Sequence, residues 1–296
     1  MKVFNIFEPI SGLLLKALGI LDKFGFTIDE IKKNSHPQED YFKISKKFPI
    51  FAVADGVTLE YSGGKYPNTS GAGEVAKIFC ESVIEEAEKS YDKFSVSDLK
   101  KVFAKANLSI GKYNREHGRV KGKINYWDFD LFATTAAFII IKNNYVYWVS
   151  ICDSSVMHFN KKGKLKFCSP ECWSNLRKNL PANWAEIPED ERKKTIRKIY
   201  RNGVDKKGNL IGYGVVTGEK TVEKYLNCGK FPIEAGDMIA VLSDGFENYM
   251  KLPEFIDMFK KWQNDLENQV KRFTAKKSLA DPKKFGHERT LIVVKI

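Results

Sequence analysis

Two apolar runs in this chain end at the same dipeptide, an acid followed by a glycine. Residues 51–54 stop at Asp55-Gly56, and residues 238–243 stop at Asp244-Gly245. An uninterrupted run of small and β-branched residues is typical of a strand buried between two layers. A glycine after the acid is expected to let the backbone turn tightly, so that its carbonyl also faces a ligand. The pattern therefore predicts two buried strands that each carry a carboxylate to a strand end.

Other segments show the alternation or the short apolar runs of strands. Residues 41–45 and 48–54 are expected to form a hairpin, and three later segments an antiparallel meander. That meander comprises residues 133–141, 145–152 and 156–160, and further strands are expected at 210–218, 222–227, 238–243 and 290–296.

Apolar residues at helical spacing predict helices between these strands. One helix follows an N-cap at Thr69 or Ser70, and another follows the capping-box pattern of Ser95 and Asp98. Further helices are expected at residues 1–23 and 253–273.

The segment 170–208 is highly charged, lacks a strand pattern and contains Trp173 and Trp184, so we expect a basic helical insertion or flap beside the site. No linker divides the chain. Residues 1–296 are therefore expected to form one α+β domain, with two sheets flanked by helix pairs.

The chain carries a formal net charge of +12, and its basic residues concentrate in residues 192–207 and 271–284. A basic surface raises the local concentration of anionic partners. Few aromatic residues interleave with these charges, so a nucleic acid is not the expected partner. The expected partner is a phosphorylated or acidic protein surface. The sequence says nothing about oligomeric state.

Five cysteines at positions 80, 152, 168, 172 and 228 include one close pair, and no second Cys or His pair completes a zinc site. Reduced cysteines in a cytoplasmic protein are the expected state. The apolar stretch 13–21 is too short and too interrupted for a membrane span, so no transmembrane segment is expected.

Acids stand at several predicted strand ends. They are Asp55, Asp153, Asp244 and Glu288, the last beside His287, and the pair Glu39-Asp40 precedes the second strand. Acids gathered in this way repel one another unless a cation lies among them. A single Asp-Gly is commonly only a turn. The whole set, in this order, predicts a metal centre with oxygen ligands.

Seven short motifs in order resemble the metal-dependent PP2C-type protein serine/threonine phosphatases. They are QED at 38–40, FAVADG at 51–56, TTAA at 134–137, CDSS at 152–155, GVVTG at 214–218, LSDG at 242–245 and RTLIVV at 289–294. The resemblance covers nearly the whole chain from about residue 30 and implies a four-layer α-β-β-α sandwich with two central antiparallel sheets.

The resemblance also implies two Mn²⁺ or Mg²⁺ ions, with a third, weaker site. By position, Asp55 would bridge both ions, the Gly56 carbonyl would face one, and Asp244 would bind one. Asp153 would serve the third ion. Glu39 or Asp40 would hold metal-bound waters. Asp55 and Asp244 are thus the expected catalytic residues.

Such a centre implies a signalling phosphatase that acts on phosphoserine and phosphothreonine in proteins. Two cations about 4 Å apart lower the pKa of a bridging water, and the resulting hydroxide attacks phosphorus in line. No cysteine is followed by Arg six positions later, which argues against a cysteine-based phosphatase.

Several positions depart from the family pattern. His287 stands where the family has an Asp, and the adjacent Glu288 is a candidate replacement ligand. Asn248 stands where many members have an acid for the third ion, with Glu247 beside it. Ser35 stands where many members have a basic residue that binds the substrate phosphate, so Lys32 or Lys33 would have to take that role. Val57 stands where eukaryotic members often have His.

Two alternatives to an active protein phosphatase therefore stay open. One is a pseudophosphatase that keeps the fold as a binding module for a phosphoprotein or regulator, as the substitutions at His287, Asn248 and Ser35 suggest. The other is a phosphatase of small anionic metabolites or nucleic-acid ends, which only the charge clusters support.

Overall fold

The strand β3, Ile50–Val57, is apolar on both faces because each face packs against a different layer. Phe51 and Val53 face the opposite sheet, while Ile50, Ala52 and Ala54 face two helices. Successive side chains of a strand point to opposite sides, so a strand covered on both sides has no polar face. This placement explains the uninterrupted apolar run in the sequence.

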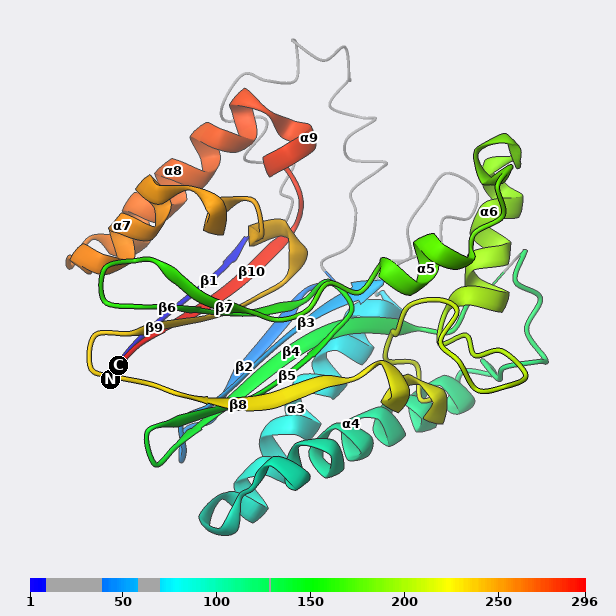
Figure 1. The fold of residues 1–296 in the computed structure, drawn as a ribbon, viewed down its shortest axis with the longest axis horizontal. Coiled ribbons are helices and arrows are strands. Elements are labelled where there is room, and N and C mark those ends of the chain that lie inside the picture. Colours follow the sequence, from blue (N-terminus) through cyan, green and yellow to red (C-terminus); the bar gives the residue numbers. More distant parts are fainter. Residues whose placement is uncertain (9–38, 58–69, 128) are drawn as a thin grey trace.

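A computed structural model describes residues 1–8, 39–57, 70–127 and 129–296, and in it two five-stranded antiparallel sheets pack face to face (Figure 1). The first sheet has the order β1-β10-β9-β6-β7, with bounds Lys2–Glu8, Arg289–Lys295, Met238–Leu242, Ser155–Phe159 and Leu165–Cys168. The second has the order β2-β3-β4-β5-β8, with β2, β4, β5 and β8 at Tyr41–Ile44, Ala133–Lys142, Tyr145–Ile151 and Asn227–Pro232.

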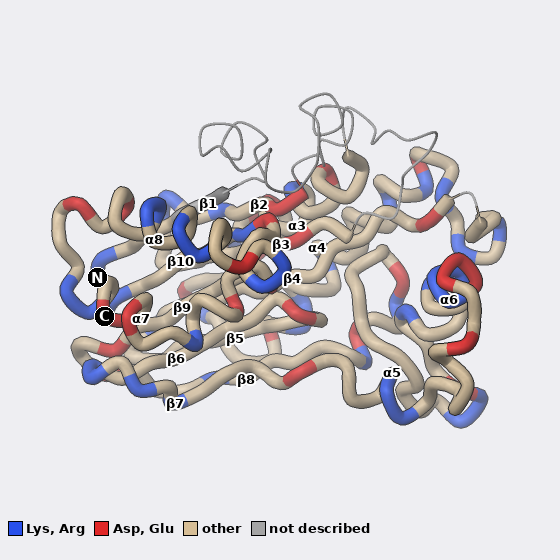
Figure 2. Tube along the Cα trace, turned by 90° about the horizontal axis from the view of Figure 1, so that it is seen from above, with Lys and Arg blue, Asp and Glu red and all other residues tan. Residues whose placement is uncertain are grey.

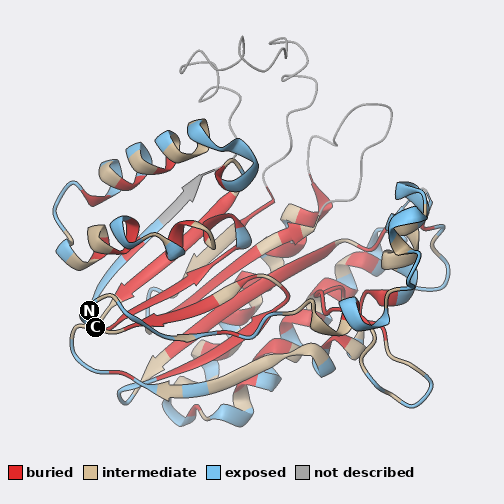
Figure 3. Cartoon of the chain, turned by 45° about the horizontal axis from the view of Figure 1, so that its top comes forward, coloured by how far each residue is buried: buried red, intermediate tan, exposed pale blue. Residues whose placement is uncertain are grey.

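Helices cover the outer face of each sheet. The long pair α3 (Gly71–Ser90) and α4 (Val96–Glu116) packs on the second sheet, and α7 (Pro253–Lys261), α8 (Leu266–Ala280) and α9 (Pro282–Phe285) lie over the first. The inner strands of each sheet are almost wholly buried, whereas the edge strands β2, β7 and β8 are partly exposed and the outer helices are exposed on the side away from the sheets (Figure 3). The predicted α+β sandwich of four layers is confirmed.

Local end signals fixed the starts of the two long helices. The Ser70 side chain accepts hydrogen bonds from the backbone N–H groups of Ala72 and Gly73. At the next helix, Ser95 and Asp98 form the expected capping box. These bonds satisfy backbone donors that the first turn of a helix leaves unpaired.

Four predictions about secondary structure were wrong. Residues 2–8, expected to begin a helix, form β1 beside β10, where their alternating pattern suits an edge strand; the rest of the predicted helix 1–23 lies outside the described residues. The segment 156–160 does not continue the meander, because β6 crosses to the first sheet and pairs with β7 and β9.

The other two errors lie later in the chain. Residues 210–218 form isolated bridges and residues 220–225 a 3₁₀ helix, η5 (Lys220–Tyr225), in place of two strands. The helix predicted at 253–273 breaks at Trp262, which adopts a left-handed backbone (φ 41°) between α7 and α8. Among the described residues, no helix has the length and apolar content needed to cross a membrane.

The segment 170–208 contains several short helices joined by turns. It contains α5 (Ser174–Asn179), α6 (Glu189–Thr195) and the π-helical turn η4 (Ile196–Tyr200). Acidic residues begin α6 and basic residues end it, so a red and a blue region meet there in Figure 2. This order complements the helix dipole, so the exposed helix carries charges that stabilise both of its ends.

A buried ion pair joins this insertion to the rest of the domain. Both Arg201 guanidinium Nη atoms lie 2.7 Å from the two Asp130 carboxylate oxygens, and both side chains are almost fully buried. Arg197 lies 3.6 Å from the same carboxylate. The next residue, Asn202, donates to the Val215 carbonyl and accepts from the Val215 N–H. The base of the insertion is therefore held by buried polar bonds.

We expect Asp130→Asn to lower the free energy of unfolding by about 3 kcal/mol, because the substitution leaves the Arg201 cation buried without its counter-charge. Urea unfolding followed by circular dichroism measures the change. The matched control is Glu189→Gln, which removes an exposed ion pair with Lys193 on the same insertion and should leave stability essentially unchanged. Equal effects of the two substitutions would contradict the role of the buried pair.

Candidate functional site

The acids predicted at strand ends come from both sheets. Asp55 lies near the end of β3 and Asp153 just after β5, both in the second sheet. Asp244 follows β9, and Glu288 directly precedes β10, both in the first sheet. Their charges perturb one another's pKa values, as described below. The sandwich therefore brings together at one end acids that are up to 233 positions apart in the chain (288 minus 55).

The two glycines that follow acids are needed for close packing. A Cβ on Gly56 would lie 2.8 Å from the Ala72 carbonyl oxygen at the start of α3, and one on Gly245 would lie 2.0 Å from the Glu288 carbonyl oxygen. Neither has the positive φ that would require glycine. The two glycines are therefore needed for steric reasons, and not for the tight turn that the sequence predicted. Any side chain at these positions would separate the elements that hold the acids.

Asp40 is buried and fixed by a serine from the other sheet. Its Oδ2 accepts a hydrogen bond from the Ser243 hydroxyl at 2.7 Å, and the Ser243 Oγ in turn accepts from the Thr290 N–H at 2.8 Å. This short chain of bonds joins the entry to β2, the end of β9 and the start of β10. It sets the position of Asp40 relative to Asp244, the residue after Ser243.

Glu39 faces a different partner. Its Oε1 accepts a hydrogen bond from the Ser70 hydroxyl at the cap of α3, and its carbonyl accepts from the Gly56 N–H at 3.1 Å. Of the two neighbours that the sequence offered for the same role, Asp40 is the one that contributes to the raised pKa of Asp55. Glu39 instead links the cap of α3 to the end of β3.

Glu288 and His287 take different directions. The Glu288 Oε1 accepts two backbone hydrogen bonds, from the N–H of Glu39 at 2.9 Å and of Asp40 at 3.0 Å. His287 is exposed, and its Nε2 lies 2.8 Å from the Lys283 carbonyl oxygen. It is close enough to Asp244 to lower that acid's pKa. Glu288 therefore braces the segment that carries Asp40, and His287 stands at the rim.

Arg289 holds the main chain around His287 and Glu288 in place. Its buried guanidinium donates to the carbonyls of Phe285 (2.9 Å) and His287 (3.2 Å) and lies over the ring of Tyr249. Because the main chain around His287 and Glu288 is bonded to this fixed cation, the turn is held where β10 begins.

Asp153 lies beside the Thr135 hydroxyl, and one of its two carboxylate oxygens is a candidate metal ligand. Thr135 and Ser154, on either side of the strand pair, share a hydrogen bond of 2.8 Å, and Thr134 donates to the Asp55 carbonyl at 2.7 Å. Within the described residues, the buried Oδ1 of Asp153 has no hydrogen-bond partner. A buried polar atom without a partner is costly, so this oxygen is a candidate ligand.

Crowding and mutual repulsion raise the pKa values of the acids. Burial first, and then the charge of Glu288, raise the pKa of Asp40 to about 7, although the Ser243 hydrogen bond opposes the shift. The pKa of Asp55 is raised well above its usual range by burial and then by the charges of Asp40, Asp244, Asp153 and Glu288. Burial is also the largest cause that raises the pKa of Asp153.

Asp244 is the most accessible of these acids, and its side chain reaches solvent. Its pKa is nevertheless raised to about 6, and burial by the surrounding protein is the largest cause. The charge of Asp153 also raises this pKa, and the charge of His287 lowers it. Glu247 also raises the pKa values of Asp153 and Asp244, although its Oε1 accepts a hydrogen bond from Lys251 at 2.6 Å. Asn248 turns away and donates to the Lys284 carbonyl at 3.1 Å.

The donor set fits a hard divalent cation. Carboxylate oxygens are the ligands that Mg²⁺ and Mn²⁺ prefer, the acids repel one another, and the Asp153 Oδ1 lacks a partner. Within the described part of the chain, however, no three His, Cys, Asp or Glu side chains gather as closely as the ligands of an ion do.

The sequence indicated no contact between the acids and the hydroxyl groups that lie beside them, although Ser70 was expected as a helix cap. Ser243, Thr135, Ser154 and Ser70 all lie beside or between the acids, and a signal existed, since most of them occur inside the quoted motifs. Three residues considered for gripping phosphate, at positions 32, 33 and 35, lie outside the described residues. Val57 is the last residue of β3, so this strand runs beyond the predicted end at residue 54 and includes Asp55 and Gly56.

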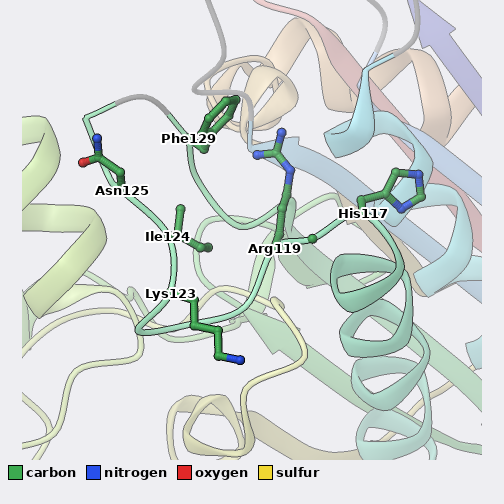
Figure 4. A pocket seen from close by; sticks show the side chains of 7 residues that line it. His117, Arg119, Lys123, Ile124, Asn125 and Phe129 are labelled. Carbon is green, nitrogen blue, oxygen red and sulfur yellow. The ribbon is translucent and has the colours of Figure 1, made fainter.

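A separate cavity of about 360 Å³ lies beyond the C-terminal end of α4, and none of the acids lines it. In Figure 4, Phe129 stands beside Arg119, while Lys123 and Asn125 point in other directions. The Arg119 guanidinium lies 3.8 Å from the centre of the Phe132 ring and donates to the Asp130 carbonyl. The cavity is basic, but its cations do not converge on one point.

Comparison with known proteins finds a family model that matches part of the chain. Residues 29–172 match a family model described as protein phosphatase 2C. No curated protein sequence matches the chain.

Solved structures share the fold. The chain is similar to the serine/threonine phosphatase Stp1 from Staphylococcus aureus, with a TM-score of 0.56 and 14% identity over 100% of this chain and 95% of that one. It is also similar to the Mycobacterium tuberculosis phosphatase PstP/Ppp (0.54, 14%, 87% and 91%). A structure of the PstP catalytic domain in complex with two manganese ions gives 0.51 and 16% identity over 87% and 90%.

We expect the cation-free protein to lose stability as pH rises from about 4 to about 7. Because the folded pKa of Asp40 is raised from 3.8 to about 7, the folded protein holds a proton that the unfolded chain releases in this window. The contribution is fully present below pH 4 and is lost through pH 7. Its size is on the order of 4 kcal/mol, shared with the acids around Asp40.

Thermal unfolding in a chelating buffer measures this dependence. Asp40→Asn, which leaves an oxygen to accept the Ser243 hydrogen bond, should flatten the profile, and so should excess Mn²⁺. The control Asp257→Asn changes an exposed acid on α7 and should keep the wild-type profile. A cation-free wild type that gains stability from pH 4 to pH 7 would disprove the coupling.

Proposed function

The chain belongs to the PP2C-type family of serine/threonine phosphatases, and on this premise we propose that it hydrolyses phosphoserine and phosphothreonine in proteins with Mn²⁺ or Mg²⁺ ions. Asp55, the Gly56 carbonyl and Asp244 would hold two ions. The observation that carries the proposal is the group of acids from both sheets whose pKa values are raised first by burial and then by mutual repulsion.

The ions, when bound, would neutralise phosphoryl oxygens and lower the pKa of a water molecule that attacks phosphorus. The chain's own residues fix where this happens. Asp55 lies on β3 of one sheet and Asp244 follows β9 of the other, so their separation is set by the rigid sandwich. Thr134 holds the Asp55 carbonyl, which orients the backbone of the Asp-Gly pair.

Asp40 would accept hydrogen bonds from waters at the centre. The Ser243 hydroxyl, which comes from the other sheet, donates to its Oδ2 and so restrains the carboxyl. With a pKa near 7 in the absence of ions, Asp40 is also a group that can hold or release a proton near neutral pH. Asp153, with Glu247 nearby, would serve a third, weaker ion.

We also infer that residues 1–296 act as one phosphatase domain and that a phosphorylated protein surface is the substrate. All described strands belong to the two packed sheets, and buried bonds tie the insertion 170–208 to the same body. The basic surface supports an anionic substrate. Competition between a phosphopeptide and a nucleotide for hydrolysis separates this proposal from a phosphatase of small anionic molecules.

We expect Asp55→Asn to reduce Mn²⁺-dependent hydrolysis of an aryl phosphate about a thousandfold, because the substitution removes the charge that both ions would share. The cation-free variant should unfold at the same temperature as the wild type or higher, since a repelling carboxylate is gone. Asp257→Asn, which also removes one acid, should keep full activity. Equal activity of wild type and Asp55→Asn would exclude the proposed role of Asp55.

We expect His287→Asp to lower the Mn²⁺ concentration needed for half-maximal activity about tenfold, because a carboxylate beside Asp244 adds a charge that the rim lacks. His287→Asn, of similar size and without charge, is the control and should give no such gain. A wild type that is inactive at every Mn²⁺ concentration, with activity appearing only in His287→Asp, would favour the binding-module alternative.

A further inference from the structure

Two cysteine sulfurs meet beside the candidate site. The Cys172 thiol donates a hydrogen bond to the Cys152 sulfur, and the two Sγ atoms lie 3.5 Å apart. Cys152 follows β5 and directly precedes Asp153, whereas Cys172 lies in the insertion, just before α5. A disulfide needs the sulfurs to approach to about 2.05 Å, so a movement of roughly 1.5 Å would join them.

The contact lies where the insertion is seated on the sheet end. Cys152 belongs to a small apolar cluster with Tyr213 and Val215, and Cys172 and Trp173 pack against that cluster. The ring centre of Trp173 lies 4.9 Å from that of Tyr213. A bond between the sulfurs would thus add a covalent link to an existing packing contact.

The pair can be reached from solvent. Cys152 and Cys172 line a cavity of about 220 Å³, together with Glu171, Asn175, Gly214 and Tyr225. Cys172 is partly exposed and Cys152 is buried. A small oxidant can therefore meet the Cys172 thiol first, with Cys152 behind it as the resolving thiol.

We propose that Cys152 and Cys172 form a reversible redox pair, which a peroxide converts to a disulfide that fastens the insertion 170–208 to the strand end beside Asp153. In the first step the Cys172 sulfur takes one oxygen from hydrogen peroxide, giving a sulfenic acid and one water. In the second step the Cys152 sulfur attacks the Cys172 sulfur. The S–S bond forms, the S–O bond breaks, and the hydroxyl leaves as water with the thiol proton.

The chemistry balances: two thiols lose two electrons and two protons, and one peroxide becomes two waters. A dithiol reductant reverses it. The cross-link closes a segment 20 positions long and restrains α5, which starts two residues after Cys172. Because Cys152 precedes Asp153, movement of its main chain would also displace that carboxylate. This last consequence for activity rests on the proposed phosphatase function.

The test is peroxide oxidation of the fully reduced full-length chain, followed by thiol titration and peptide mapping without reductant. The expected result is a fall from five titratable thiols to three and a cross-linked peptide joining Cys152 to Cys172, both reversed by dithiothreitol. Cys172→Ser should abolish the cross-link. The matched control Cys168→Ser, which removes an exposed cysteine four positions earlier, should keep it.

Hydrogen exchange gives a second readout. Amides of 174–200 should exchange more slowly in the oxidised wild type than in the reduced wild type, with no such change in Cys172→Ser. Oxidation of Cys172 only to sulfinic acid, or a cross-link that uses Cys168 or Cys228, would overturn the proposal.

Activity is followed separately. If the reduced wild type hydrolyses an aryl phosphate with Mn²⁺, oxidation should lower that activity in the wild type and leave Cys172→Ser unchanged. A reduced wild type without activity would count against the proposed function, while the cross-link and exchange data would still decide the redox pair.

Discussion

Repulsion among carboxylates at one end of the sandwich is the constraint that the rest of the site depends on. Burial and the charges of its neighbours raise the pKa of Asp55 well above the usual range. In a flexible chain these acids would simply move apart. Here they are attached to strands of two packed sheets, and the absence of a Cβ at Gly56 and Gly245 lets those elements approach closely. Only protons or cations can relieve the repulsion, which is why the pKa shifts indicate a cation site.

The scaffold opposes this repulsion with neutral groups. Hydroxyls and backbone N–H groups, such as those that bind Asp40 and Glu288, hold the carboxylates without adding positive charge. Two buried arginines serve structural roles: Arg289 binds main-chain carbonyls, and Arg201 neutralises Asp130. The net charge of +12 therefore acts as a field around the domain, while the centre stays acidic and available to metal ions.

Local rules predicted the parts of the fold that depend on local sequence. The strand that carries Asp55, the strand that leads to Asp244 and the two caps at Ser70 and Ser95 follow from pattern and end signals, and all are present. The errors arise where a partner far away in sequence decides. Residues 2–8 are a strand because β10 lies beside them, and β6 leaves the meander because β9 offers an edge in the other sheet.

The same division applies to the site. The order of acids along the chain was readable, whereas the bonds from Glu288 to the N–H groups of Glu39 and Asp40 span about 249 positions and left no local signal. These bonds bear on how far the departure at His287 reaches. One Glu288 oxygen braces the segment that carries Asp40, so the charge of Glu288 acts on the centre from that place.

His287 stands at the rim, bonded to the Lys283 carbonyl and beside the accessible Asp244. The substitution thus changes the charge next to one proposed ligand and leaves the bonds around Asp40 and Asp55 in place. We infer that its effect is to weaken ion binding on the Asp244 side. The choice between an enzyme and a binding module then depends on the concentration of divalent cation around the protein. A higher cation concentration can offset weaker ligands, but it cannot replace missing residues that position those ligands.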